Sequence, residues 1–141
     1  MMVLYFTNKA VSQSDFANWA FSRSDCDSAT EECNQGLPLI RVEELYENWK
    51  INVDHRTSAL TYSDTQDEIN AERPLQVVFN WTSGSWHLVI LVGWLVQAGE
   101  QKVIVNDPYH NGVGLHSYSS VLEGYGLGKW TDTYLGFRKS A

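Results

Sequence analysis

The sequence has few cysteines, a deficit of basic residues and no long apolar run. Its two cysteines say little about the redox environment, and a chain of 141 residues buries enough apolar surface to fold without disulfide staples. The longest apolar run covers residues 88–96, well short of the roughly 20 residues that a membrane-spanning helix requires. We therefore expect a single domain over residues 1–141, with this run as a buried element.

The charge balance excludes several classes of partner. Ten basic residues against 17 acidic ones give a formal net charge of −7 and a pI of about 4.9, so nucleic acid and anionic membrane surfaces are not expected to bind. Residues 1–6 have no basic flank and no cleavage pattern, so they are not a signal peptide. The compartment, secretion included, is left open. No cofactor is expected.

The predicted elements change from helical to extended along the chain. Helices are expected after a capping box formed by Ser12 and Asp15, after Pro38, and after a second capping box that begins at Ser63. A long loop is expected between the first two helices. Strands are expected at 75–81, 86–96, 102–105 and 130–138, with a short helix at 119–125. Helices followed by strands indicate an α+β fold.

His87 and Asp107 carry the clearest functional signal. His87 opens one predicted strand, and Asp107 follows the next. If the two strands are antiparallel neighbours joined by a turn at 97–100, these side chains meet. A carboxylate beside an imidazole fixes its tautomer and favours the imidazolium, as a nucleophile's partner requires. The alternative is a hydrogen-bonded His at a strand edge, with Asp107 as a turn former.

Three sequence blocks resemble a known group of enzymes. They are residues 73–81, 83–94, which include Ser-Gly-Ser-Trp-His, and 103–108, which end in Asn-Asp-Pro. In order and spacing they resemble the His and Asp blocks of bacterial papain-like cysteine peptidases, namely the bacteriocin-processing, double-glycine type and the effector peptidases of plant-pathogenic bacteria. Two shorter stretches resemble the effector type, so the likeness covers most of the chain.

The resemblance implies a papain-like fold, with N-terminal helices packed on a C-terminal antiparallel β-sheet. It implies peptide-bond hydrolysis by a Cys-His-Asp triad, with His87 and Asp107 as two of its members. Peptides or proteins would be the substrates. Trp86 and Ser85 are candidates for substrate binding, although Trp86 also fits a residue that packs against the sheet.

The third member of the triad is missing from the expected place. In the resembled families the nucleophilic Cys begins a helix, and residues 2–6 look like the end of that helix, which would therefore be truncated here. The Cys and its oxyanion Gln would precede Met1. Cys26 and Cys33 lie among acidic residues that disfavour a thiolate, and we interpret them as a disulfide or a reduced structural pair. The chain as given is expected to be inactive, through truncation or as a pseudoenzyme.

Two other functions stay open. The first is a non-catalytic binding module that uses the remaining groove, with a second copy or another chain covering apolar surface left by the truncated helix. The second is a metal site built from His87, Asp107, His110 and His116. No HExxH or CxxC spacing supports that site, so no metal is expected. His55 is interpreted as a solvated loop residue.

Overall fold

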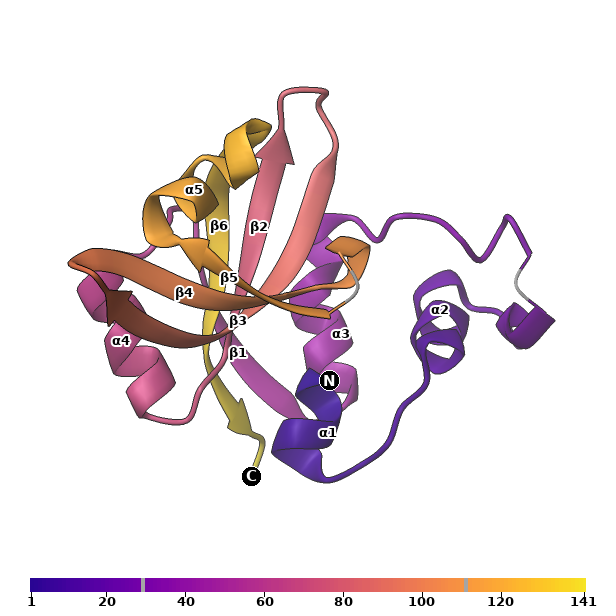
Figure 1. Cartoon of the computed structure of the whole chain (residues 1–141). Coiled ribbons are helices and arrows are strands. Elements are labelled where there is room, and N and C mark those ends of the chain that lie inside the picture. Colours follow the sequence, from indigo (N-terminus) through magenta and orange to yellow (C-terminus); the bar gives the residue numbers. More distant parts are fainter. Residues whose placement is uncertain (29, 111) are drawn as a thin grey trace. The chain divides into compact units, whose positions relative to one another are not determined.

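The computed structural model describes residues 1–28, 30–110 and 112–141 (Figure 1). The described residues form two compact units, one of Met1–Val53 with Arg138–Ala141 and one of Asp54–Phe137. Each unit is described by itself below. The expectation of one domain over the whole chain stays a prediction.

Helices dominate the first third of the chain and strands the rest. The helices are α1 (Met2–Thr7), α2 (Gln13–Phe21), α3 (Val42–Asn48), α4 (Tyr62–Asn70) and α5 (Tyr118–Leu122), with short 3-10 helices η1 (Cys26–Ser28), η2 (Leu39–Arg41), η3 (Pro108–His110) and η4 (Gly124–Gly126). The strands are β1 (Ile51–Arg56), β2 (Leu75–Trp81), β3 (Trp86–Gln97), β4 (Glu100–Asp107), β5 (Gly112–Ser117) and β6 (Gly128–Lys139). None of the described helices is long and apolar enough to span a bilayer.

The strands form one sheet in the order β1-β6-β2-β3-β4-β5. Strand β2 pairs antiparallel with both β3 and β6, and β4 pairs antiparallel with both β3 and β5. Helices in the first part of the chain and an antiparallel sheet in the second confirm the predicted α+β class. How the N-terminal helices pack on the sheet stays a prediction.

Local capping chemistry explains where two helices begin. The Ser12 hydroxyl accepts the Asp15 amide at 3.0 Å while the Asp15 carboxylate accepts the Ser12 amide at 2.8 Å, which is the predicted capping box. The prediction for α4 was wrong in position. Its cap is Thr61, whose hydroxyl accepts the Asp64 amide at 3.1 Å. Ser63 lies inside the helix, because Thr61 two residues earlier satisfies the first amides.

The sequence pattern missed two strands at the ends of the sheet order. β1 is mostly exposed and polar, and β5 contains glycines, so neither shows the alternation typical of a half-buried strand. The interpretation of His55 as a loop residue was therefore wrong, whereas its expected exposure to solvent was correct. It lies on β1, its ring stacks 4.5 Å from that of Tyr134, and its Nε2 is 3.4 Å from the Asp132 carboxylate.

The hydrophobic core of residues 54–137 lies on one face of the sheet. Alternate residues of β2, β3 and β4 point to this face, since side chains in a strand alternate between its two sides. The fully buried members on these strands are Leu75, Val77, Phe79, Val89, Leu91, Val103 and Val105. Tyr62 and Val121 belong to the same cluster, so α4 and α5 cover that face. Cross-strand pairing matches Leu75 with Leu91 and Val77 with Val89.

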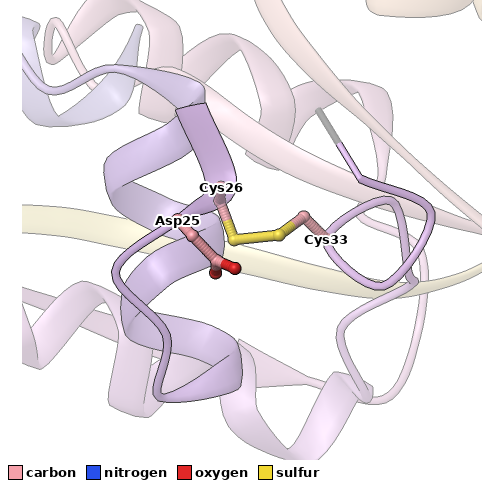
Figure 2. Close-up of side chains that lie close together, drawn as sticks. All are labelled: Asp25, Cys26 and Cys33. Atoms are coloured by element: carbon pink, nitrogen blue, oxygen red, sulfur yellow. A yellow bond between two sulfur atoms is a disulfide. The ribbon is translucent and has the colours of Figure 1, made fainter. Parts of the chain in front are cut away.

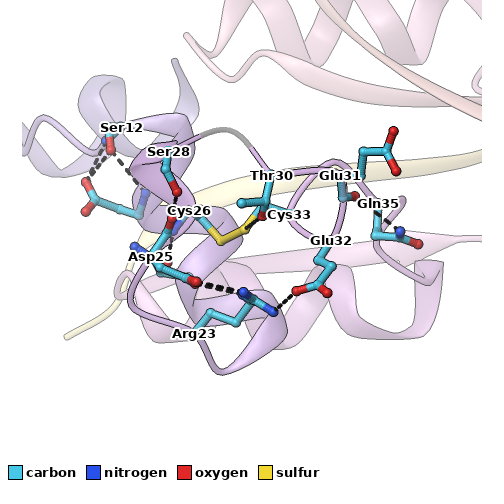
Figure 3. The surroundings of a disulfide bond; sticks show 12 residues. Ser12, Arg23, Asp25, Cys26, Ser28, Thr30, Glu31, Glu32, Cys33 and Gln35 are labelled. Carbon is cyan, nitrogen blue, oxygen red and sulfur yellow. Dashed lines mark hydrogen bonds and ion pairs between the residues drawn. A yellow bond between two sulfur atoms is a disulfide. The ribbon is translucent and has the colours of Figure 1, made fainter.

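A disulfide closes the predicted loop after α2. Cys26 and Cys33 are bonded, with their Cα atoms 5.6 Å apart, and Figure 3 shows the polar contacts around them. The Arg23 guanidinium pairs with both Asp25 and Glu32. These contacts pin a segment that has little periodic structure of its own.

Candidate active site

The β2-β3 hairpin places His87 at the end of the hydrophobic core. Gly84 has a φ of 90°, a conformation that glycine adopts without strain, and the turn closes where the Trp81 amide donates to the Ser85 carbonyl at 2.8 Å. The register then sets His87 opposite Phe79. His87 continues the alternation of Val89 and Leu91, so its side chain lies on the core face.

Asp107 reaches the same place from β4. It continues the alternation of Val103 and Val105, which lie on the same face. The structure brings the two candidate residues together: His87 Nε2 is 2.8 Å from Asp107 Oδ1. The side chains are 10% and 2% exposed. Strand β4 runs through Asp107 rather than ending at Val105, because Asn106 and Asp107 pair with β5.

The surroundings of Asp107 keep it ionised. Burial alone would raise its pKa. The Tyr109 amide, which donates to Oδ1 at 2.9 Å, and His87 outweigh burial and hold the pKa of Asp107 below its usual value, with a smaller contribution from the Tyr125 hydroxyl. An ionised Asp107 accepts a hydrogen bond from the Nε2–H of His87, which leaves Nδ1 as the nitrogen that can exchange a proton with a nucleophile.

Two aromatic rings contact the imidazole, one of them the largely exposed ring of Tyr109. The Trp81 ring stacks on His87 at 5.3 Å with an interplanar angle of 18°, and the Tyr109 ring meets it edge-on at 5.4 Å. The stacked indole covers one face of the imidazole and limits its rotation. The sequence reading did not single out Trp81 or Tyr109.

Tyr125 is a third residue at the site that sequence reasoning missed. It has a φ of 57° between Gly124 and Gly126, which also have positive φ. A left-handed conformation is unfavourable for an aromatic residue, so contacts of the Tyr125 side chain must offset that cost. Its ring contacts Phe79 at 5.1 Å and His116 at 4.7 Å. Burial and then the charge of Asp107 raise the pKa of Tyr125. The Gly-Tyr-Gly sequence is the signal that could have revealed it.

A hollow of about 800 Å³ opens beside His87. Both residues predicted to bind substrate line it, Trp86 with 47% exposure and Ser85. The complete described lining is Trp81, Ser85, Trp86, His87, Tyr109, His116, Ser120, Tyr125 and Leu127. The first interpretation of Trp86, a side chain that packs against the sheet, gives way to a side chain that is half exposed and lines this hollow.

Neither cysteine of the sequence offers a free thiol, because Cys26 and Cys33 are bonded to each other. Asp25, Cys26 and Cys33 are the one group of three metal-ligand side chains that lie close together within the described residues (Figure 2). Bonded sulfurs do not provide the thiolates that such a site would require. Of the four residues considered for a metal site, His110 has a side chain outside the described part.

Comparison with known proteins assigns the family. The model of the Peptidase_C39 like family matches residues 1–136, and the chain belongs to this family. This confirms the resemblance to papain-like cysteine peptidases, and the chain is a cysteine peptidase-type domain.

No curated protein matches the chain. Among solved structures it is similar to a Pseudomonas avirulence protein, AvrPphB, with 9% identity over 87% of this chain and 70% of the other, at a TM-score of 0.40. The superposition is loose, and nothing about function follows from it.

Proposed function

We propose that this domain supplies the general base and its orienting carboxylate to a cysteine peptidase that hydrolyses peptide bonds. The contact of 2.8 Å between His87 Nε2 and Asp107 Oδ1 carries the proposal. It unites two residues 20 positions apart in the sequence, in a family of peptidases, beside a hollow that is open to a ligand.

Each group has a role in the proposed hydrolysis. Nδ1 of His87 takes the proton of a thiol, and the resulting thiolate attacks the peptide carbonyl to form an acyl-enzyme. The same nitrogen protonates the amine as its bond to the carbonyl carbon breaks, and His87 then takes a proton from the water that hydrolyses the thioester, which releases the acid and restores the thiol. Asp107 holds the ring by Nε2 and stabilises the imidazolium.

The mechanism requires a thiol that neither cysteine of residues 1–141 offers. Cys26 and Cys33 are consumed by their disulfide, and they belong to a different unit from His87. We infer that the printed chain does not cleave peptides alone and that a preceding segment carries the nucleophile. A gene that encodes no such Cys would instead make the protein a pseudoenzyme that binds peptides in the hollow.

Labelling with a thiol-reactive peptide probe tests the proposal on a chain extended by its upstream coding sequence. We expect the extended protein to react about 100-fold faster than its His87→Ala variant, the scale that a general base contributes. His55→Ala is the matched control, since His55 also lies near a carboxylate, Asp132, but does not line the hollow. Equal labelling of the native protein and His87→Ala would refute the mechanism.

Tyr125→Phe is expected to raise the pKa of Asp107, because the hydroxyl of Tyr125 contributes to lowering it. A carboxyl whose pKa is lowered in the folded state stabilises the protein above its unfolded-state pKa, and this contribution is lost as pH falls through the folded value. In Tyr125→Phe the contribution is smaller, and its loss still begins near the unfolded-state pKa but is complete at a higher pH. Carbon-13 NMR titration of the Asp107 carboxyl measures the shift.

Tyr118→Phe separates this effect from a general loss of packing. Tyr118 is partly buried, and its hydroxyl donates to the Leu60 carbonyl. Removing that hydroxyl should cost stability of about 1 kcal/mol while the pKa of Asp107 stays unchanged. An identical titration of Asp107 in native protein and Tyr125→Phe would show that Tyr125 is only a packing residue.

A further inference from the structure

We propose that the hollow beside His87 is a pocket for a bulky, uncharged side chain, aromatic or branched aliphatic, of a bound peptide. The inference deepens the proposed function, because a peptide placed for cleavage next to His87 must lay a side chain against this wall. Two observations support it: aromatic side chains line the hollow, and its described lining holds no charged side chain.

The described lining is mostly aromatic and comes from three parts of the fold. Trp81 and Trp86 flank the β2-β3 turn, Tyr109 follows β4, and Tyr125 and Leu127 come from the segment before β6. Aromatic side chains bind apolar groups over a large area at a low entropy cost. A volume of about 800 Å³ is within the range of ligand pockets and exceeds what one small side chain fills.

Charge decides between classes of side chain. No Asp, Glu, Lys or Arg is found among the described lining residues, so a charged side chain would be desolvated there without a counter-ion. Aromatic faces attract cations, but the described lining offers no carboxylate to pair with a buried ammonium or guanidinium group. An anion would meet the negative faces of the rings. A neutral apolar side chain encounters neither penalty.

The exposed lining residues indicate that the site is incomplete without a ligand. Trp86 is 47% and Leu127 60% exposed, although both line the same hollow as the partly buried rings of Trp81 and Tyr125. Burying these exposed apolar side chains under a ligand is favourable. Because the hollow lies next to His87, the group that covers them is a side chain of the bound peptide close to the bond being cleaved.

The test uses the chain of residues 1–141, because binding of a peptide requires no thiol. The probes are blocked five-residue alanine peptides with phenylalanine, lysine or aspartate at the centre, followed through the indole N–H signals of the six Trp residues. We expect saturable shifts of Trp81 and Trp86 with the phenylalanine peptide, at an affinity about tenfold higher than for either charged peptide. The signals of Trp94 and Trp130, whose N–H groups donate to internal acceptors, should stay in place.

A matched pair of variants locates the site. Leu127→Ala should weaken binding of the phenylalanine peptide about fivefold, whereas Leu115→Ala, an exposed leucine on β5 that does not line the hollow, should leave it unchanged. Equal affinity for the three peptides, no saturable binding, or shifts confined to other Trp residues would overturn the inference. None of these results would alter the labelling of the extended chain, so the two proposals fail separately.

Discussion

Gly128→Ala is expected to lower the free energy of unfolding by about 3 kcal/mol, the upper range for forcing an atom into a packed site. Gly128 faces Trp81 in the β2-β6 pairing. An added Cβ would lie 2.1 Å from the Asn80 carbonyl oxygen and 2.9 Å from the Trp81 Cα. These are backbone atoms, and β2 is paired on its other side with β3, so the strand cannot yield locally. Urea unfolding measures the loss.

Gly36→Ala is the matched control for this substitution. No atom lies within 4 Å of the Cβ it would add, and its stability should change by no more than about 0.5 kcal/mol. A Gly128→Ala protein as stable as the native one would contradict the β2-β6 register. Because Trp81 stacks on His87, a displaced β2 should also disturb the imidazole, which makes this glycine a support of the site.

Asp107→Asn is expected to reduce peptide hydrolysis by the extended chain on the order of ten-thousandfold, the loss when a triad carboxylate is replaced by its amide. An amide oxygen can still accept from the Tyr109 amide and from His87, both of which now donate to Oδ1. The geometry is therefore retained while the charge that stabilises the imidazolium is lost. Steady-state hydrolysis of a fluorogenic peptide measures the effect.

The control for Asp107→Asn is a carboxylate near a histidine elsewhere in the same unit. Asp132 lies 3.4 Å from His55, and Asp132→Asn should leave hydrolysis nearly unchanged. If the activity of Asp107→Asn were within a few-fold of that of the native enzyme, the charge of Asp107 would not be needed to stabilise His87 during catalysis. The proposed triad would then lose its third member.

Much of the fold was predictable because local rules agreed with the tertiary structure. Strands β2 and β3 are dense in β-branched and aromatic residues, and both appear within a residue of the predicted bounds. The capping box at Ser12 placed the start of α2. Strand β5 was not predictable in this way, because it exists only through pairing with β4, and nothing in its own sequence demands an extended backbone.

The contact between His87 and Asp107 could be predicted from the expected strand topology. The turn at residues 97–100 and the antiparallel rule brought the start of one strand beside the end of the next. Alternation of side chains then put both residues on one face. Tyr125 and Trp81 could not be found in this way, since each reaches the imidazole or the carboxylate from a segment whose path depends on the whole sheet.

The sequence by itself determined the α+β class, most of the helix and strand segments and the two residues that meet at the end of the core, because each follows from periodicity, capping or the turn between adjacent strands. Only the tertiary structure decided the Cys26–Cys33 bond, the rings that hold His87 and the uncharged hollow next to it. These depend on distances between residues remote in sequence, and local preferences do not specify such distances.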